Sequence, residues 1–142
     1  MTEAPTPRLK AILICDQIIT EVGTNKKSLI GVFEIINTPN FPCIHPFLAL
    51  YVKFTEAKGE YTFKLELLDL NKNLIIGRGE IPKPIRIEDP MKTTELVFNF
   101  RGLTFNHEGE YEFRLFINGK IFAQKTFLVR KIGRIEALER GY

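Results

Sequence analysis

Two segments of the chain alternate apolar and polar residues with a period of two. In YTFKLELLDL, residues 61–70, and in EYEFRLFI, residues 110–117, every second side chain of the first seven is aromatic or aliphatic. Successive side chains of a β-strand point to opposite faces, so this pattern predicts strands with one buried and one solvated face. Asn118-Gly119 follows the second segment directly and precedes another apolar-rich run at 120–129. Because this dipeptide tolerates two successive positive φ angles, it predicts the turn of a β-hairpin.

Runs of β-branched and aromatic residues, separated by Gly, Asn and Pro, predict five more strands. They cover residues 11–22, 28–36, 47–54, 74–81 and 94–100. Cys15-Asp16-Gln17 interrupts the first run and predicts a bulge or bend, since a buried strand does not normally carry a carboxylate. Gly31 in the second run indicates a bulge or a close backbone approach.

Roughly eight short strands without a helical pattern predict an all-β fold. We expect an antiparallel β-sandwich, an immunoglobulin-like or C2-like Greek key of about seven to nine strands, with an open barrel as the alternative. Gly109-Glu110-Tyr111 supports this, since a Tyr at the start of a late strand is typical of the tyrosine corner. The chain has no Trp, and Phe113 stands where disulfide-bonded domains carry a cysteine. A second Gly-Glu-Tyr at residues 59–61 predicts the same local structure, a turn glycine that leads into a half-buried aromatic strand.

The length of 142 residues and a hydrophobic content of 44% suit a single domain with one core. We expect a flexible tail over residues 1–10, the sandwich over 11–131, and a tail or short helix over 132–142. The N-terminus lacks the basic start and apolar core of a signal peptide, and no apolar run approaches the roughly 20 residues of a membrane span. We therefore expect a cytoplasmic protein that does not associate with a membrane.

The two cysteines, Cys15 and Cys43, are expected as reduced thiols in that compartment. They can form a disulfide only if their Cα atoms lie within about 7 Å. Cys15, Cys43, His45 and His107 together would give a two-Cys, two-His set of the kind zinc favours. Their spacing does not match that of paired zinc ligands, so we predict neither a metal nor another cofactor. We expect the Asp16 carboxylate to accept backbone N–H groups from a neighbouring loop.

A net charge of +3 is mildly basic. Nucleic-acid binders concentrate such charge in a patch or stripe. The nearest equivalent comprises Lys120, Lys125, Arg130, Lys131 and Arg134. We interpret these residues as a solvated strand face and do not expect nucleic-acid binding.

The segment FPCIHP, residues 41–46, places Cys43 and His45 two positions apart. In an extended chain both side chains point to one side. A thiol activated by imidazole also needs an orienting third group, which Asp16 or Glu108 would supply. Prolines flank the pair, and we interpret the segment as a connection between strands rather than a catalytic site.

Residues 13–54 resemble a family of small, functionally uncharacterised bacterial proteins. The resemblance rests on Cys15-Asp16 in an apolar strand, the turn GTNKK at 23–27, SLIGVF at 28–33, and Phe-Pro with His-Pro at 41–46. The sequence GEYEFRLFINGK at 109–120 is also similar to the last hairpin of that family. The resemblance implies a β-sandwich and supplies no reaction, ligand or partner.

We therefore expect a non-catalytic binding or assembly module that acts through a sheet face or edge loops on a protein partner or a second copy. Its expected interface is apolar and comprises Phe116, Phe122, Phe127, Ile132, Ile135 and Leu138. The alternative is a small thiol-dependent or hydrolytic enzyme that uses Cys43, His45 and Asp16.

Overall fold

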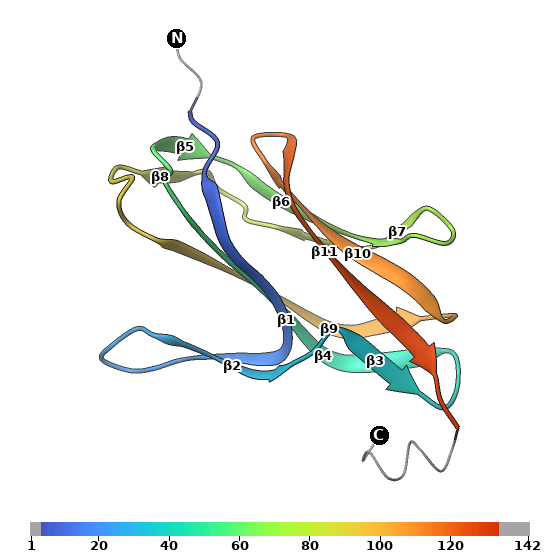
Figure 1. Ribbon diagram of the computed structural model, residues 1–142. Coiled ribbons are helices and arrows are strands. Elements are labelled where there is room, and N and C mark those ends of the chain that lie inside the picture. Colours follow the sequence, from blue (N-terminus) through green and yellow to red (C-terminus); the bar gives the residue numbers. More distant parts are fainter. Residues whose placement is uncertain (1–3, 134–142) are drawn as a thin grey trace.

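The computed structural model describes residues 4–133, whose regular structure consists of β-strands (Figure 1). No helix within this range has the length and apolar character that crossing a membrane requires. The strands are β1 (Arg8–Thr20), β2 (Lys27–Val32), β3 (Ile35–Thr38), β4 (Cys43–Thr55), β5 (Gly59–Tyr61), β6 (Phe63–Asp69), β7 (Leu74–Glu80), β8 (Ile85–Ile87), β9 (Thr94–Phe105), β10 (Gly109–Ile117) and β11 (Lys120–Lys131).

Two layers face each other across the core. One sheet has the order β2-β1-β4-β9 and the other the order β3-β11-β10-β6-β7, while β5 and β8 form a small separate pair. Figure 1 shows the two layers with the start of β1 and β5 at one end and β3 at the other. This architecture confirms the predicted all-β sandwich. The strand number exceeds the expected range because β3, β5 and β8 are short elements that the sequence pattern did not separate.

Aromatic side chains fill the space between the layers. Tyr111 packs edge-on against Phe105 with ring centroids 4.9 Å apart and stacks on Phe127 at 5.9 Å. Phe127 in turn stacks on Phe113 at 5.6 Å. All four side chains are buried. Each such pair contributes about 0.5–1.5 kcal/mol beyond its buried area, so this cluster is a principal source of cohesion between the sheets.

The hairpin predicted at Asn118-Gly119 is confirmed. Asn118 and Gly119 both have positive φ, 50° and 79°, and Ile117 pairs with Lys120 across them. The Asn118 side chain also accepts the Thr62 N–H at 2.8 Å, which ties this turn to the start of β6. Another hairpin, nearer the N-terminal end of the described chain, pairs β1 with β2 in antiparallel register.

The prediction of a single strand at residues 28–36 is wrong. The chain leaves the first sheet after Val32 and continues as β3 in the second sheet, where it runs parallel to β11. The crossing at Glu34 is fixed by its carbonyl, which accepts the Leu128 N–H at 3.0 Å, and by an ion pair of its carboxylate with Lys125. Because the chain changes sheet at this point, its backbone N–H and C=O groups find hydrogen-bond partners in both layers of the sandwich.

The interpretation of residues 43–46 as a connection is also wrong. They form the start of β4, with Cys43 paired to Phe105 and His45 to Leu103 on β9. The predicted strands at 47–54 and 94–100 are therefore the central parts of two longer strands. Proline is tolerated at this end because β4 pairs there with β9 alone among the described residues.

β1 bends in the middle, as the interruption at residues 15–17 predicts. It pairs with β4 from Arg8 to Cys15 and with β2 from Cys15 to Thr20. Residues 16–32 thus form a two-stranded ribbon, here named the arm, which projects from the sandwich at the lower left of Figure 1.

The N-terminal end of the domain differs from the expected boundary at residue 11, whereas the last described strand ends at the expected residue 131. β1 begins at Arg8, inside the predicted tail, and the Tyr61 hydroxyl donates a 2.6 Å hydrogen bond to the Pro5 carbonyl. β11 ends at Lys131. Within the predicted C-terminal tail or helix, Ile132 and Gly133 are described, and the rest lies outside the described residues.

Candidate functional site

The bend in β1 brings Asp16 close to His45. Asp16 Oδ1 lies 3.5 Å from His45 Nε2, and the carboxylate side chain is 55% exposed. Asp16 therefore faces an imidazole rather than the backbone N–H groups that we predicted. His45 Nε2 is buried and has no hydrogen-bond partner among residues 4–133, and the ring packs against Phe33 with centroids 5.4 Å apart. This polar pair lies at the base of the arm.

Gly31 explains why Asp16 fits at this position. Gly31 has φ +70°, and a Cβ there would collide with the Asp16 carboxylate and lie 3.0 Å from Asp16 Cγ. The glycine therefore provides both a left-handed conformation and the space for the carboxylate. Of the bulge or close backbone approach predicted at Gly31, the structure shows a close approach, made by the Asp16 side chain to the Gly31 backbone.

A groove of about 440 Å³ opens where β1 leaves β4. Its walls combine Asp16 from β1, Phe47 from β4, and Phe100 and Arg101 from β9. The Arg101 guanidinium lies over the Phe47 ring at 5.8 Å. The groove thus has charges of both signs and an exposed aromatic ring.

The proposed thiol enzyme requires Cys43 to contact His45. Both side chains lie on β4 and are partly buried, but no hydrogen bond joins them within the described part of the chain. The other suggested orienting group, Glu108, accepts the Lys131 N–H at 3.1 Å instead. Within the described residues, the structure therefore brings Asp16 to His45 but joins neither side chain to a thiol by a hydrogen bond.

The two-Cys, two-His set is not assembled. Cys15 pairs with Ala49, six positions from Cys43 along β4, which corresponds to roughly 20 Å of strand. Both thiols are free, and burial raises the pKa of Cys15. His107 lies at the β9–β10 turn. In residues 4–133 no three His, Cys, Asp or Glu side chains converge as a metal site would require.

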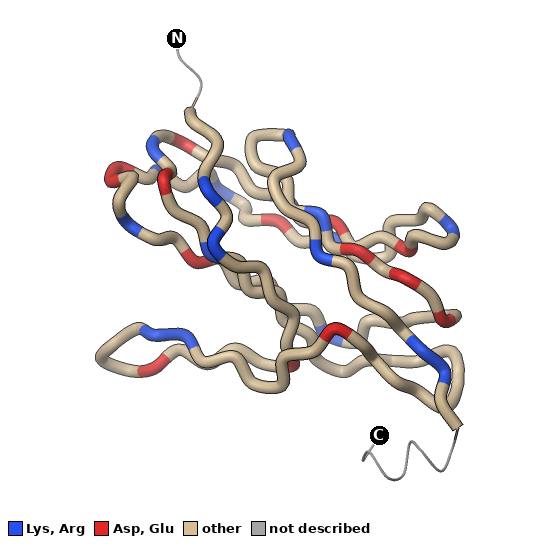
Figure 2. The backbone as a smooth tube through the Cα atoms, in the orientation of Figure 1, with Lys and Arg blue, Asp and Glu red and all other residues tan. Residues whose placement is uncertain are grey.

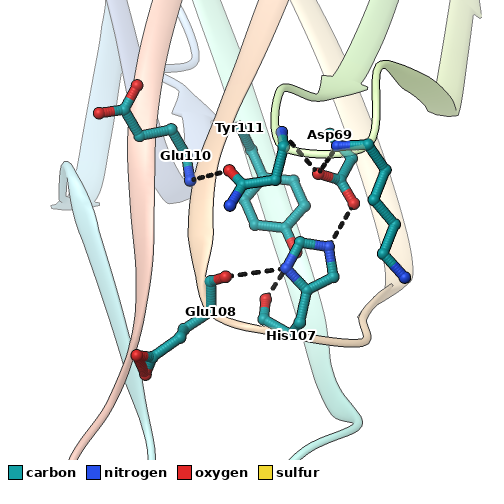
Figure 3. A network of polar contacts seen from close by, with 7 residues as sticks. Asp69, His107, Glu108, Glu110 and Tyr111 are labelled. Atoms are coloured by element: carbon teal, nitrogen blue, oxygen red, sulfur yellow. Dashed lines mark hydrogen bonds and ion pairs between the residues drawn. The ribbon is translucent and has the colours of Figure 1, made fainter.

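A second polar cluster, at the opposite end of β10 from the Asn118-Gly119 turn, was missed by the sequence analysis (Figure 3). Asp69 is buried at the end of β6 and lies 2.5 Å from His107 Nε2. Its other oxygen accepts the N–H groups of Asn71 at 3.0 Å and Lys72 at 3.2 Å. The Tyr111 hydroxyl donates to the His107 carbonyl at 2.7 Å, which confirms the predicted tyrosine corner.

Both ring nitrogens of His107 face acceptors. Nδ1 lies 2.8 Å from the Glu108 carbonyl, and Nε2 faces the Asp69 carboxylate. The carbonyl and the carboxylate raise the pKa of His107, and both favour the doubly protonated ring. Burial, together with the Asp69 charge, raises the pKa of Tyr111 to about 12. With both nitrogens engaged, His107 has no free site for proton transfer to a substrate.

The sequence contains only a weak signal for this cluster. An Asp at a strand end before Asn-Lys-Asn is typical of a side chain that bonds the following turn. The pairing with His107, 38 positions later, depends on β6 and β10 being neighbours.

The predicted apolar interface requires correction. Phe127 and Ile132 are buried, and Phe122 is partly buried with its ring 5.9 Å from Phe54. Phe116 is partly covered by Lys64, whose ammonium lies 5.4 Å from the ring centroid. Ile135 and Leu138 lie outside the described residues. The exposed apolar side chains include Ile19, Ile30 and Val32 of the arm and Phe47 beside it.

Two basic residues of β11 contact polar side chains of the segment before it in the sheet order, residues 34–38. Lys125 pairs with Glu34, and Arg130 Nε donates to the Asn37 side chain at 3.0 Å. Figure 2 shows acidic and basic residues mixed over both sheets. Arg134 lies outside the described residues.

Solved structures include distant likenesses. The alkylpurine DNA glycosylase AlkC of Pseudomonas fluorescens, bound to DNA with an abasic site analog, matches with a TM-score of 0.55 at 7% identity, over 88% of this chain and 30% of that chain. An immunoglobulin-like protein from Pseudomonas aeruginosa matches with a TM-score of 0.41 at 13% identity, over 87% of this chain and 96% of that chain. At 7% identity, the likeness to the glycosylase shows a shared fold alone, and this chain spans less than a third of that protein.

No curated protein sequence matches the chain. The resemblance in the sequence led us to expect a functionally uncharacterised family. Because DUF6941, a family of unknown function, matches residues 10–130, the chain belongs to this family.

Proposed function

We propose that this protein is a non-catalytic binding or assembly module that contacts protein through its arm. The observation that carries the proposal is the set of apolar side chains that the arm leaves in water. Ile19 is 44%, Ile30 45% and Val32 52% exposed. They come from both strands of the ribbon, and Phe47 extends the apolar surface onto β4. Apolar surface gathered on one projecting element is typical of an interaction site.

The construction of the arm supports this reading. A two-stranded ribbon is marginally stable in water, and it gains stability when one of its faces is covered or another strand is added. The arm joins the sandwich at Cys15, where β1 pairs on both sides, and beyond that point it has only its own hairpin pairing among the described residues. We expect the module to act in the cytoplasm, where thiols such as Cys15 and Cys43 stay reduced.

The geometry of the polar groups supports a non-catalytic role. His45 contacts an exposed carboxylate but no thiol, and His107 has both nitrogens engaged. An activated nucleophile requires a base within hydrogen-bond reach, and neither histidine serves one in the described residues. The pairing of Lys125 with Glu34 and of Arg130 with Asn37 likewise gives no support to a nucleic-acid surface on β11.

A photo-cross-linking amino acid placed at Val32 in cells of the native host tests this proposal. We expect discrete protein adducts, because a partner on the arm would lie within reach of the probe. Ile121 on β11 is a matched control, since it is equally exposed at 52% but lies in the other sheet. The absence of discrete adducts at position 32, or identical adducts at both positions, would contradict a role for the arm.

A further inference from the structure

The arm has a free strand edge on the side where β4 would continue. β1 pairs with β4 up to Cys15 and Ala49, and from Asp16 to Thr20 it pairs only with β2 among the described residues. The free edge therefore presents backbone N–H and C=O groups beside the groove at the bend. Such an edge is a template for another strand.

The edges of β2, β9 and β7 are less suited to strand addition. The free edge of β2 is interrupted by Gly31 at φ +70°, and β9 contains Gly102 at φ +64°. β7 contains two glycines, Gly77 and Gly79, which weaken a strand. Residues 16–20 contain neither glycine nor proline.

We propose that a second copy of this chain occupies this edge, with two β1 strands antiparallel about a two-fold axis at Ile18. The two arms then form one sheet of order β2-β1-β1-β2 across the dimer. This inference rests on the proposed function and names the partner that the arm binds. A two-fold interface brings each surface against its own copy, so the strand must be complementary to itself.

The sequence of the edge meets this condition. With Ile18 on the axis, Ile18 faces its own copy, Gln17 faces Ile19, and Asp16 faces Thr20. No like charges are opposed in this register, and like charges directly opposite would be destabilising. The Thr20 hydroxyl accepts a 2.7 Å hydrogen bond from Lys27 Nζ. The register therefore brings the Asp16 carboxylate of one copy near the Lys27 ammonium of the other, and the two-fold axis repeats this contact.

Position-specific cross-linking tests the register. Directly opposed residues of antiparallel strands lie within the Cα separation that a disulfide spans. Under oxidised glutathione, Ile18→Cys should give a covalent dimer on a non-reducing gel, while Ile121→Cys and the wild type with its native Cys15 and Cys43 should not. Rapid dimer formation by Ile121→Cys, or none by Ile18→Cys, would overturn the proposed pairing.

Sedimentation of the full chain tests the dimer itself. We expect a concentration-dependent dimer that Lys27→Glu weakens about tenfold relative to Lys26→Glu, because only Lys27 lies beside Thr20 in the register. A strict monomer, or equal affinities of the two variants, would overturn the inference. If the chain is a monomer while the probe at Val32 captures another protein, the second copy is wrong and the proposed function stands. If the chain is a monomer and the probe at Val32 also forms no adduct, the second copy and the proposed function are both wrong.

Discussion

The two Gly-Glu-Tyr segments of this chain share a local structure but differ in their surroundings. Gly59 and Gly109 both have positive φ, 123° and 151°, and Tyr61 and Tyr111 are both buried with hydroxyls that donate to backbone carbonyls. At Tyr61 the hydroxyl holds the N-terminal segment at Pro5 and also accepts the Lys58 N–H at 3.0 Å. At Tyr111 the hydroxyl holds the preceding turn.

The difference lies in charge. The Tyr111 corner contains the buried Asp69 and its partner His107, whereas the hydrogen bonds of the Tyr61 hydroxyl all go to backbone groups. The same three residues thus produce one corner with a histidine–carboxylate ion pair and one corner without such a pair. The local Gly-Glu-Tyr pattern therefore determines the backbone conformation, while the neighbouring strands determine the charges around it.

The largest effect is expected from Asp69→Ala, which breaks the charged corner. It removes the partner of His107 and the acceptor of two turn N–H groups, and we expect a loss of about 3 kcal/mol in unfolding free energy, measured with urea. Asp89→Ala is the control, because Asp89 also accepts a turn N–H, from Met91 at 2.9 Å, but is exposed. Equal losses in the two variants would show that the burial of Asp69 and its histidine partner contribute nothing.

A smaller effect is expected when each corner loses its hydroxyl. Tyr61→Phe leaves one donor, the Lys58 N–H, and two acceptors, the Pro5 and Lys58 carbonyls, without this partner, and we expect a loss of about 2 kcal/mol. Tyr111→Phe leaves one acceptor, the His107 carbonyl, and we expect about 1 kcal/mol. Hydrogen exchange should accelerate near Arg8 in Tyr61→Phe only. The reverse order of stability would contradict the assignment of more hydrogen bonds to the Tyr61 hydroxyl than to the Tyr111 hydroxyl.

The smallest effect is a pH dependence confined to the charged corner. The pKa of His107 is raised in the folded state, so its contribution to stability is fully present below the unfolded value of about 6.5 and is lost as pH rises through the folded pKa. Urea unfolding of the wild type, compared with His107→Gln, should show this loss only in the wild type. Tyr61→Phe should keep the wild-type pH dependence. A pH dependence that persists unchanged in His107→Gln would assign it to another group.

Local patterns predicted the parts of the fold that depend on neighbouring residues. Alternation identified β6 and β10, Asn118-Gly119 identified a hairpin, and the interruption at Asp16 identified the bend in β1. The errors arose where distant segments decide. The crossing at Glu34 depends on β11, which lies about ninety positions further along the chain.

The candidate site was predicted only in part, for the same reason. Asp16 and His45 were named from the sequence and lie together in the structure. Phe127 was assigned to an exposed apolar interface. It pairs with Tyr111 across the hairpin, however, and both side chains point into the core. Asp69 and His107 were not paired because their contact depends on β6 and β10 being neighbours.

The parallel pairing of β3 with β11 has a consequence during synthesis. β11 is the last of the described strands to be synthesised, yet in its sheet it lies between β3 and β10. Until it emerges, β3 has no neighbour in that sheet and one side of β10 stays open. Unpaired edges of this kind are prone to aggregation in incomplete chains. A truncation or stalled translation before residue 120 would therefore leave an open sheet rather than a smaller domain.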